Sequence, residues 1–301
     1  MPDKVAYIIG DIHGCFQELL ELEAKIKEHA KRHHWSPYIV CVGDLIDRGP
    51  DSNKVVEHFL RGKNAGTHTV ITGNHECEFL RLIQAFHPNL WTSDSPWPFY
   101  LHTIKEDFDR NHLSATQFDS FEGYREILYI SWLNQGGSET LSSYFCESEK
   151  IPEWKFPPDH VEFLSSLPLY WENSNMIVTH ALAQSQDYQL IVRASKAELS
   201  KNGFVLERDL EDTESLKPAE VRQSAISLIW NRFPPVNRLH PHKTHISGHT
   251  PLDHARVSKG LGFIQLDTGC VYGKRLTSWC QKTETFLHVE SETSWNRPVS
   301  F

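Results

Sequence analysis

The strongest constraint on the fold is an alternation of strand-like and helix-like segments in the first quarter of the chain. Three short apolar stretches have the length of buried strands, and helical apolar patterns follow them. These stretches are Val5–Ile9, Tyr38–Val42 and Thr67–Ile71. Strand–helix–strand repetition predicts a largely parallel sheet covered by helices. Further short strands are predicted in the second half, at Met176–Val178, His245–Ser247, Phe263–Leu266 and Thr285–Val289.

Two helices of the first part show a clear start or a clear apolar face. One is predicted from about Cys15 to Ala30, and Glu23 faces outward or lies at the edge of its apolar stripe. Ser52 is predicted to be the N-cap of the next helix. The segment from Lys196 to Lys217 is highly charged, so a solvated helix or loop is expected there.

The pattern changes between about residues 85 and 165, where aromatic residues are frequent and the spacing is irregular. Leu101–Phe108 and Tyr124–Leu133 have helical patterns. We interpret this region as a helical, cap-like insertion beside a functional site, within one domain spanning residues 1–301. The alternative, a plain helical layer of the core with no role in substrate choice, stays open.

Composition limits the classes of protein to which the chain can belong. The formal net charge of −9 argues against non-specific nucleic-acid binding, which needs a basic surface. The six cysteines form no C-x-x-C pair, so reduced thiols are expected. No signal peptide precedes the first strand, and no apolar run approaches the roughly 18 residues of a membrane helix. We therefore expect a soluble, cytoplasmic protein without a membrane partner; its oligomeric state stays open.

Each of the first three predicted strands ends in a cluster of metal-binding residue types, at Gly10–Gly14, Gly43–Pro50 and Gly73–Glu76. In open α/β sheets, ligands bind beyond the carboxyl ends of the strands. Asp11 and His13 project to one side of an extended chain and can reach the same ion. The clusters therefore predict a polar site at one sheet edge.

The remaining candidate ligands come from other strand ends. The two oxygens of Asp44 could bridge two ions, and Asn74 offers a neutral oxygen. His180 and His249 follow predicted strands of the second half. A single Asp there is usually a turn residue and a single His usually a surface or core residue, but six candidate ligands at the ends of five predicted strands favour a metal centre. Mixed oxygen and imidazole ligands suit Mn, Fe, Zn or Ni better than Ca or Mg.

Four motifs resemble the metallophosphoesterases, and within them the phosphoprotein phosphatase branch of bacterial type. They are Gly-Asp-x-His-Gly at 10–14, Gly-Asp-x-x-Asp-Arg-Gly at 43–49, Gly-Asn-His-Glu at 73–76 and Gly-His-Thr-Pro at 248–251. The resemblance extends to Trp132–Gly137 with Glu139–Leu141, and to Leu266–Gly273. It implies an α/β fold with four layers, α/β/β/α, in which helices flank two mixed sheets and the site lies at their shared edge.

The resemblance also implies a centre of two divalent ions, with manganese preferred and iron, zinc or nickel possible. The ligands of the first ion would be Asp11, His13 and Asp44, and those of the second would be Asp44, Asn74, His180 and His249. Two such ions lower the pKa of a shared water to near neutrality, so that it can attack phosphorus without a serine or cysteine nucleophile.

Catalytic and substrate-binding roles follow from the same resemblance. His75 would be the general acid, oriented by Asp47. Arg48 and Arg232 would bind the phosphate oxygens, and Asn74 would also face the substrate. One departure concerns the segment after His180, where Leu182 stands in place of the usual glycine; a positive φ there would strain it.

Three functions are compatible with this site. The Trp-Leu-x-x-Gly-Gly segment favours a serine/threonine protein phosphatase, acting on a phosphorylated protein or another phosphoester through a metal-bridging hydroxide. The alternative is a symmetrical hydrolase of dinucleoside polyphosphates such as diadenosine tetraphosphate, in which the aromatic insertion could stack an adenine. A non-catalytic scaffold that binds phosphoproteins is disfavoured, because His75, Asp47 and Arg48 are all present.

Overall fold

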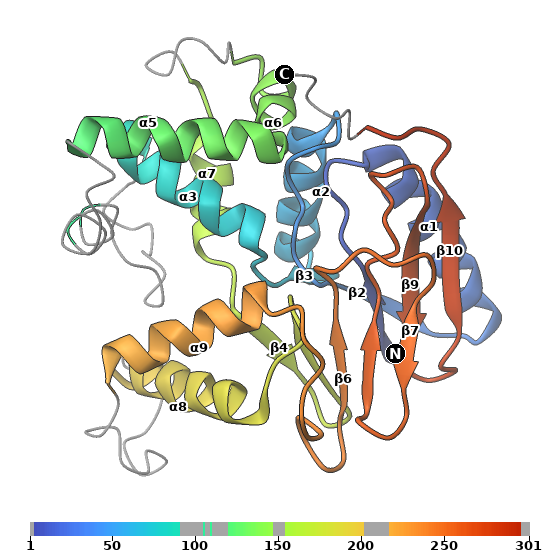
Figure 1. Cartoon of the computed structure of the whole chain (residues 1–301). Helices are drawn as coiled ribbons and strands as arrows, with labels where there is room; N and C mark the ends of the chain where they lie inside the picture. The colour runs from blue at the N-terminus through green and yellow to red at the C-terminus, as the bar shows by residue number, and fades with distance from the viewer. Residues whose placement is uncertain are drawn as a thin grey trace.

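Two five-stranded sheets form the centre of the molecule in the computed structural model, which describes residues 3–90, 105, 109, 120–146, 154–201 and 217–295. Helices cover the outer faces of both sheets (Figure 1). The expected α/β/β/α layering, with two mixed sheets flanked by helices, is confirmed. All six cysteines are free, in line with the expected reduced thiols, and all six are buried.

The first sheet has the order β10-β9-β1-β2-β3. Its three parallel strands are β1 (Lys4–Ile9), β2 (Ser36–Cys41) and β3 (His68–Val70). The strands β9 (Arg275–Cys280) and β10 (Phe286–Glu290) complete it, with β9 antiparallel to both β1 and β10. The three N-terminal strands and the last strand were predicted from the sequence, whereas β9 was missed.

The second sheet has the order β4-β5-β6-β8-β7. Its parallel strands are β5 (Met176–Thr179), β6 (Thr244–Ser247) and β8 (Phe263–Gln265), all three predicted within a few residues. Two short antiparallel strands, β4 (Tyr170–Glu172) and β7 (Arg256–Ser258), lie at its edges.

Alternate residues of the strands point into different layers, because side chains of a strand alternate between the two faces of a sheet. Ile8 and Val40 pack against Val178 and Ile246 between the sheets. On the outer face of the first sheet, Tyr7 and its neighbours pack against α1 (Phe16–Arg32) and α2 (Ser52–Asn64). On the outer face of the second, Ile177 packs against α8 (Ser185–Lys201) and α9 (Pro218–Trp230).

The region from 85 to 165 is largely helical where the structure describes it. It follows most of α3 (Asn74–Phe86) and contains η1 (Pro88–Leu90), α5 (Phe121–Trp132), the π-helical segment η2 (Leu133–Gly137), α6 (Ser138–Ser143) and α7 (Pro158–Ser165). Trp132, Trp154 and Phe156 belong to the same hydrophobic cluster as β1 and α1. The predicted helix at Leu101–Phe108 lies outside the described residues except for residue 105, and the single-domain interpretation stays a prediction.

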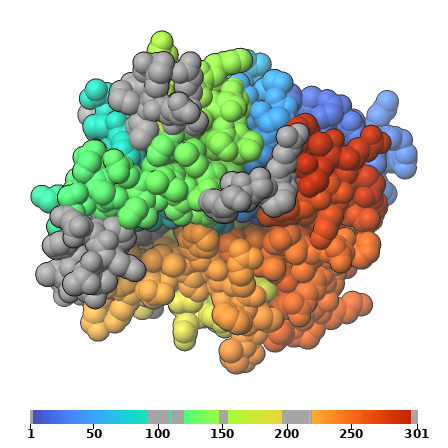
Figure 2. Space-filling model, turned by 45° about the horizontal axis from the view of Figure 1, so that its top comes forward, coloured from blue at the N-terminus to red at the C-terminus, as the bar shows by residue number. Residues whose placement is uncertain are grey.

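Figure 2 shows the face on which the two halves of the chain meet, with the green residues of α5 and α6 beside orange residues of the last third. None of the described helices is long and apolar enough to cross a membrane. In the charged segment, helix α8 continues to Lys201, and residues 202–216 lie outside the described ranges.

Two local predictions were wrong. Asp51, not Ser52, is the N-cap of α2. The hydroxyl of Ser52 instead accepts a hydrogen bond from the Asp47 backbone N–H at 3.1 Å. Glu23 is buried, with 1% of its surface exposed, although the helical pattern had placed it outward or at the stripe's edge.

Candidate active site

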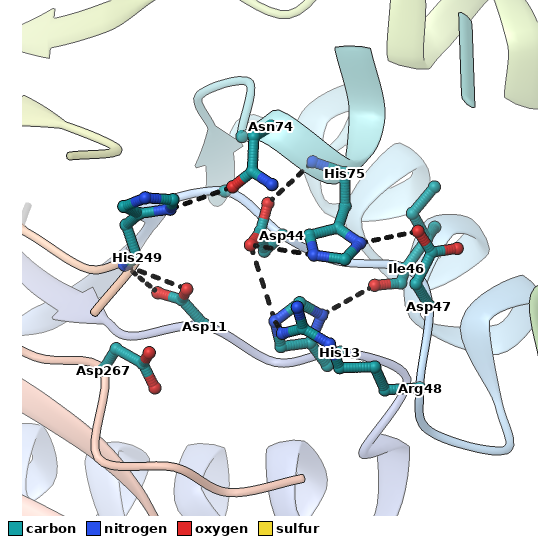
Figure 3. A network of polar contacts seen from close by, with 12 residues as sticks. Asp11, His13, Asp44, Ile46, Asp47, Arg48, Asn74, His75, His249 and Asp267 are labelled. Atoms are coloured by element: carbon teal, nitrogen blue, oxygen red, sulfur yellow. Dashed lines mark hydrogen bonds and ion pairs between the residues drawn. The ribbon is translucent and has the colours of Figure 1, made fainter. Parts of the chain in front are cut away.

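The predicted ligands meet where the two sheets share an edge (Figure 3). Asp11 and Asp44 lie in the loops after β1 and β2, and Asn74 begins α3 after β3. His180 follows β5 and His249 follows β6 in the second sheet. All five are at least 94% buried, so the parallel strands deliver these polar side chains into a protected site.

Asp44 lies at the centre of the cluster. Its Oδ2 atom lies 3.5 Å from His13 Nε2, 3.4 Å from His180 Nε2 and 4.0 Å from His75 Nε2. Its Oδ1 atom accepts a hydrogen bond from the His75 backbone N–H at 3.2 Å. One carboxylate therefore faces imidazoles from both sheets, which is the geometry expected of a bridging ligand.

Asn74 links the two histidines of the second sheet. Its Oδ1 atom is 2.9 Å from His180 Nε2 and 3.0 Å from His249 Nδ1. The two imidazole nitrogens are 3.2 Å apart. Asp11 lies beside them, and its carboxylate accepts hydrogen bonds from the His249 backbone N–H at 3.0 and 3.2 Å.

The hydrogen bonds of His13 and His180 indicate whether the clustered side chains could bind a cation. His13 Nδ1 lies 2.9 Å from the Ile46 carbonyl, and His180 Nδ1 lies 2.9 Å from the Val42 carbonyl. A carbonyl oxygen only accepts, so each Nδ1 carries the hydrogen and each neutral ring directs the Nε2 lone pair at Asp44. The His13 lone pair also receives a hydrogen from Arg48, but the His180 lone pair faces oxygens of Asp44 and Asn74 at 3.4 and 2.9 Å. Lone pairs that face one another repel unless a cation lies between them, so the residues fit a metal centre.

The shifted pKa values of the residues in the site also favour a bound cation. Burial lowers the pKa of His13 and of His180, and it lowers the pKa of His249 to about 3, so these rings stay neutral. Burial, with the carboxylates of Asp267 and Asp44 nearby, raises the pKa of Asp11 well above its usual value. Crowded buried carboxylates and neutral imidazoles are stabilised by divalent ions, whose ligands must be deprotonated.

His75 stands next to this cluster and forms a pair with Asp47. Its Nδ1 atom lies 2.7 Å from Asp47 Oδ2, and both side chains are almost fully buried. Burial disfavours the charged ring, but the Asp44 and Asp47 carboxylates outweigh it and raise the pKa of His75. A histidine whose protonated form is favoured beside the metal-ligand cluster can donate a proton to a leaving group.

The Asp47 carboxylate is itself fixed by the helical region. Trp132 Nε1 donates to its Oδ2 atom at 3.0 Å, and the Thr140 hydroxyl donates to its Oδ1 atom at 2.7 Å. These donors come from α5 and α6. The region between residues 85 and 165 therefore orients the His75–Asp47 pair.

Arg48 lies at the rim of the same cluster. Its Nη1 atom is 2.6 Å from His13 Nε2, and its guanidinium lies 5.7 Å from the centre of the Tyr272 ring. Its backbone N–H donates to the Gly136 carbonyl at 2.9 Å. A Cβ atom on Gly136, whose φ is +104°, would lie 2.4 Å from the Arg48 nitrogen, so this close approach requires glycine.

Arg232 is exposed just beyond the end of α9, and its positive charge contributes to the low pKa of His249. Arg232 is therefore near enough to His249 for the two side chains to interact electrostatically. The role of Arg232 in binding phosphate stays a prediction. The Trp230 ring packs edge-on against the His249 ring, with centroids 5.8 Å apart.

Backbone strain is concentrated in the loops that carry the site. His13, Asp44, Asp47, Arg48 and His249 all have positive φ values, from 47° to 71°. Such conformations cost of order 1–3 kcal/mol each and persist only where the surroundings enforce them. The sharp turns point these side chains into one volume.

Leu182 does not have the positive φ that would have strained it. Its side chain is buried, and its carbonyl accepts a hydrogen bond from Asn231 Nδ2 at 2.6 Å. Leucine in place of the usual glycine is therefore accommodated by an ordinary backbone conformation.

The sequence reasoning missed the roles of several residues that it had quoted within motifs. Glu76 accepts hydrogen bonds from the backbone N–H groups of Gly73, Asp44 and Leu45 at 2.7–2.9 Å, and so fixes the metal-binding loops. Asp267 adds a buried carboxylate beside Asp11. The sequence signal for these two roles was the position of Glu76 in Gly-Asn-His-Glu and of Asp267 in Leu-Asp-Thr-Gly.

Comparison with known proteins agrees with the geometry. Residues 5–253 match the family model described as calcineurin-like phosphoesterase. The bis(5'-nucleosyl)-tetraphosphatase PrpE [asymmetrical] of Halalkalibacterium halodurans is 43% identical over 280 residues, which are 90% of this chain and 87% of that protein. The symmetrical bis(5'-nucleosyl)-tetraphosphatase of Neisseria gonorrhoeae is 27% identical over 95% of both chains. The solved structure of a Saccharomyces cerevisiae protein serine/threonine phosphatase with similarity to human phosphatase PP5 aligns over 97% of this chain and 81% of that one, with 13% identity and a TM-score of 0.48.

Proposed function

The chain belongs to the calcineurin-like phosphoesterase family, and we propose that it hydrolyses dinucleoside tetraphosphates. It is a metal-dependent phosphoester hydrolase, as the family and the tetraphosphatase relatives indicate. The names of these relatives support the dinucleotide substrate, which the sequence had suggested as the alternative to a phosphoprotein. The tetraphosphatase of H. halodurans, at 43% identity, carries this proposal.

The metal ligands are proposed as the sequence predicted them. Asp11, His13 and Asp44 would hold one divalent ion, and Asp44, Asn74, His180 and His249 would hold the other. Two bound ions would lower the pKa of a water molecule and offset the charge of the phosphate chain. Manganese is our proposal for the metal, since mixed oxygen and imidazole ligands suit it.

The side chains around these ligands would bind the phosphate chain and transfer a proton. Arg48 and Arg232 would contact phosphoryl oxygens, whose charge increases in the transition state. As the water oxygen bonds to phosphorus, the bond to the bridging oxygen breaks. His75 would give its proton to that oxygen, and Asp47 would hold the imidazole in position.

We make a separate prediction about which phosphoanhydride bond is cleaved. The relative with 43% identity is named as asymmetrical, whereas the gonococcal relative is named as symmetrical. The higher identity favours asymmetrical cleavage, in which a diadenosine tetraphosphate yields ATP and AMP. Symmetrical cleavage would yield two molecules of ADP.

Product analysis tests both statements in one experiment. The purified protein, loaded with Mn²⁺, is given diadenosine tetraphosphate, a phosphoserine peptide and para-nitrophenyl phosphate, and the nucleotides are separated by chromatography. We expect ATP and AMP in equal amounts, with slower release of phosphate from the peptide. Cleavage of the peptide with an intact dinucleotide would reinstate the protein phosphatase hypothesis and overturn this proposal.

A further inference from the structure

A second group of metal-ligand side chains lies outside the catalytic cluster, between α1, α2 and β3. Glu23 Oε1 is 2.6 Å from His58 Nε2 and 3.0 Å from His68 Nε2. The three donor atoms lie within 4.8 Å of one another. Glu23 is 1% exposed, and the His68 and His58 side chains are 11% and 23% exposed.

The hydrogen bonds of His68 allow either of its nitrogens to carry the hydrogen of the neutral ring. Its Nδ1 atom is 2.7 Å from the Thr67 hydroxyl oxygen, and that hydroxyl lies 3.2 Å from the Gly62 carbonyl. When the hydroxyl donates to Gly62, the Thr67 oxygen accepts from His68 Nδ1, and a neutral His68 directs the lone pair of Nε2 at the Glu23 carboxylate. When the hydroxyl donates to Nδ1 instead, His68 Nε2 donates to Glu23 at 3.0 Å, and binding of an ion at Nε2 releases that hydrogen.

The glycine at position 62 lowers the stability of α2 but leaves space for the His68 ring. Gly62 lies inside α2, where glycine costs roughly 0.5–1 kcal/mol relative to alanine. A Cβ atom on Gly62 would lie 2.3 Å from Cγ and Nδ1 of His68. Only glycine at this position lets the imidazole approach Glu23, so the group is a built feature of three elements.

We propose that Glu23, His58 and His68 bind a single divalent ion of the zinc type, separate from the catalytic centre. Two imidazoles and one carboxylate are a common ligand set for zinc, and partial exposure of His58 leaves room for water as the fourth ligand. Zinc–nitrogen bonds of about 2.0–2.1 Å in a tetrahedron place ligand atoms roughly 3.3 Å apart. The observed 2.6 and 3.0 Å are hydrogen-bond distances and shorter than this spacing, so the side chains would move apart by less than about 1 Å to take up the ion.

One cation already lies beside the group. Lys27 Nζ is 3.0 Å from Glu23 Oε2, but the Lys27 side chain is 66% exposed and contacts only the oxygen that faces away from the histidines. An ion bound by Oε1 and the two Nε2 atoms would thus leave the lysine in place. The ion would connect α1 and α2 to β3, and the segment after β3 leads to Asn74 and His75 at the start of α3.

Zinc content provides the test on the full chain. Wild-type protein and the His68→Gln variant are stripped with a chelator, loaded with Zn²⁺, desalted and analysed by mass spectrometry of the metal. We expect the variant to hold one zinc ion per chain fewer, while the glutamine amide can still hydrogen-bond to Glu23. His160→Gln is the matched control, because His160 Nε2 contacts a single glutamate, Glu57, at 3.0 Å; its zinc content should equal that of the wild type.

Two further measurements separate this site from the catalytic one. In an Asp44→Asn/His180→Asn background we expect one zinc ion with His68 present and none with His68→Gln. With both centres intact, the cobalt-loaded difference spectrum between wild type and His68→Gln should show the intense visible bands of tetrahedral Co²⁺. Equal zinc contents, or a featureless difference spectrum, would show that protonated histidines alone hold Glu23 and would overturn the proposal.

Discussion

At the scale of single residues, His75 offers the clearest test of the chemistry. We expect His75→Asn to lower kcat on diadenosine tetraphosphate about 10²–10⁴-fold, since general acid catalysis typically contributes that much. The loss should be similar for para-nitrophenyl phosphate, because its phenol and the phosphate group of the leaving nucleotide both ionise near neutral pH. Steady-state kinetics on both substrates provide the measurement.

The metal content of His75→Asn must match that of the wild type, because the His75 ring is assigned to proton transfer and not to metal binding. Metal analysis of the same sample checks this. Full activity of the variant on the dinucleotide would contradict the general-acid assignment, whatever the metal content.

A second residue-scale prediction concerns His245 and acid stability. Its ring is fully buried, and burial lowers its pKa to about 3. The unfolded chain takes up a proton near pH ~6.5 and the folded chain does not, so acidification favours unfolding. Between pH 7 and pH 5 this histidine alone should remove about 2 kcal/mol from the free energy of unfolding.

The His245→Gln variant isolates this contribution. The glutamine amide can replace the contact of His245 Nε2 with the Thr179 hydroxyl, which spans 2.7 Å, but cannot take up a proton in this pH range. Urea unfolding of chelated wild type and variant at both pH values provides the measurement. Equal losses in the two proteins would assign the acid sensitivity to other groups.

Single residues also show where prediction from sequence ends. Asp44, Asn74 and His180 could be placed at the site because each ends a recognisable strand, and parallel strands direct their ends to one edge. The bonds from Trp132 and Thr140 to Asp47 cross 85 and 93 residues, and no local pattern specifies such contacts. Glu23 was misplaced for a related reason, since its burial depends on histidines from α2 and β3.

At the scale of elements, β9 shows why a central strand can be missed. Leu276, Thr277, Ser278, Trp279 and Cys280 are all buried, because the strand lies between β1 and β10 with both faces covered. Such a strand lacks the alternation of apolar and polar residues that identifies a half-exposed strand. Edge strands β4 and β7, with three residues each, are too short to show a period.

The contact between α5 and the Asp47 loop yields a prediction of its own. Trp132→Phe removes the indole donor to Asp47 Oδ2 and keeps most of the ring volume. We expect kcat to fall about tenfold with KM unchanged, since a hydrogen bond to a charged group contributes ~1.5–3 kcal/mol and only part of it acts on His75. Kinetics on diadenosine tetraphosphate check the result.

Trp154→Phe is the matched control for that variant. Trp154 is buried in the same hydrophobic cluster, but its Nε1 atom has no hydrogen-bond partner among the described residues. This substitution should leave kcat within about twofold of the wild type. Equal losses in the two variants would mean that core packing, not the bond to Asp47, explains the effect.

At the scale of the whole molecule, the catalytic centre joins the two sheets. Asp11, Asp44 and Asn74 come from the first sheet, while His180 and His249 come from the second. Ions bound between them would act as a cross-link that exists only in the folded state. A ligand at one hundred times its Kd adds about 2.7 kcal/mol to the free energy of unfolding.

Metal removal should therefore lower the stability of the whole chain as well as its activity. We expect a chelator to lower Tm by several degrees and to abolish hydrolysis, and Mn²⁺ to restore both. The experiment uses the His68→Gln variant, so that the proposed Glu23 site does not contribute. Differential scanning calorimetry and hydrolysis of para-nitrophenyl phosphate provide the two readouts.

Asp44→Asn in the same background distinguishes a cross-link between sheets from a general effect of salt. Without the bridging carboxylate, the chelator and Mn²⁺ should leave Tm almost unchanged. If the chelator destabilised both proteins equally, the ions would act elsewhere on the surface. If it destabilised neither while abolishing hydrolysis, the sheets would be held together by their apolar interface alone, through residues such as Ile8, Val178 and Ile246.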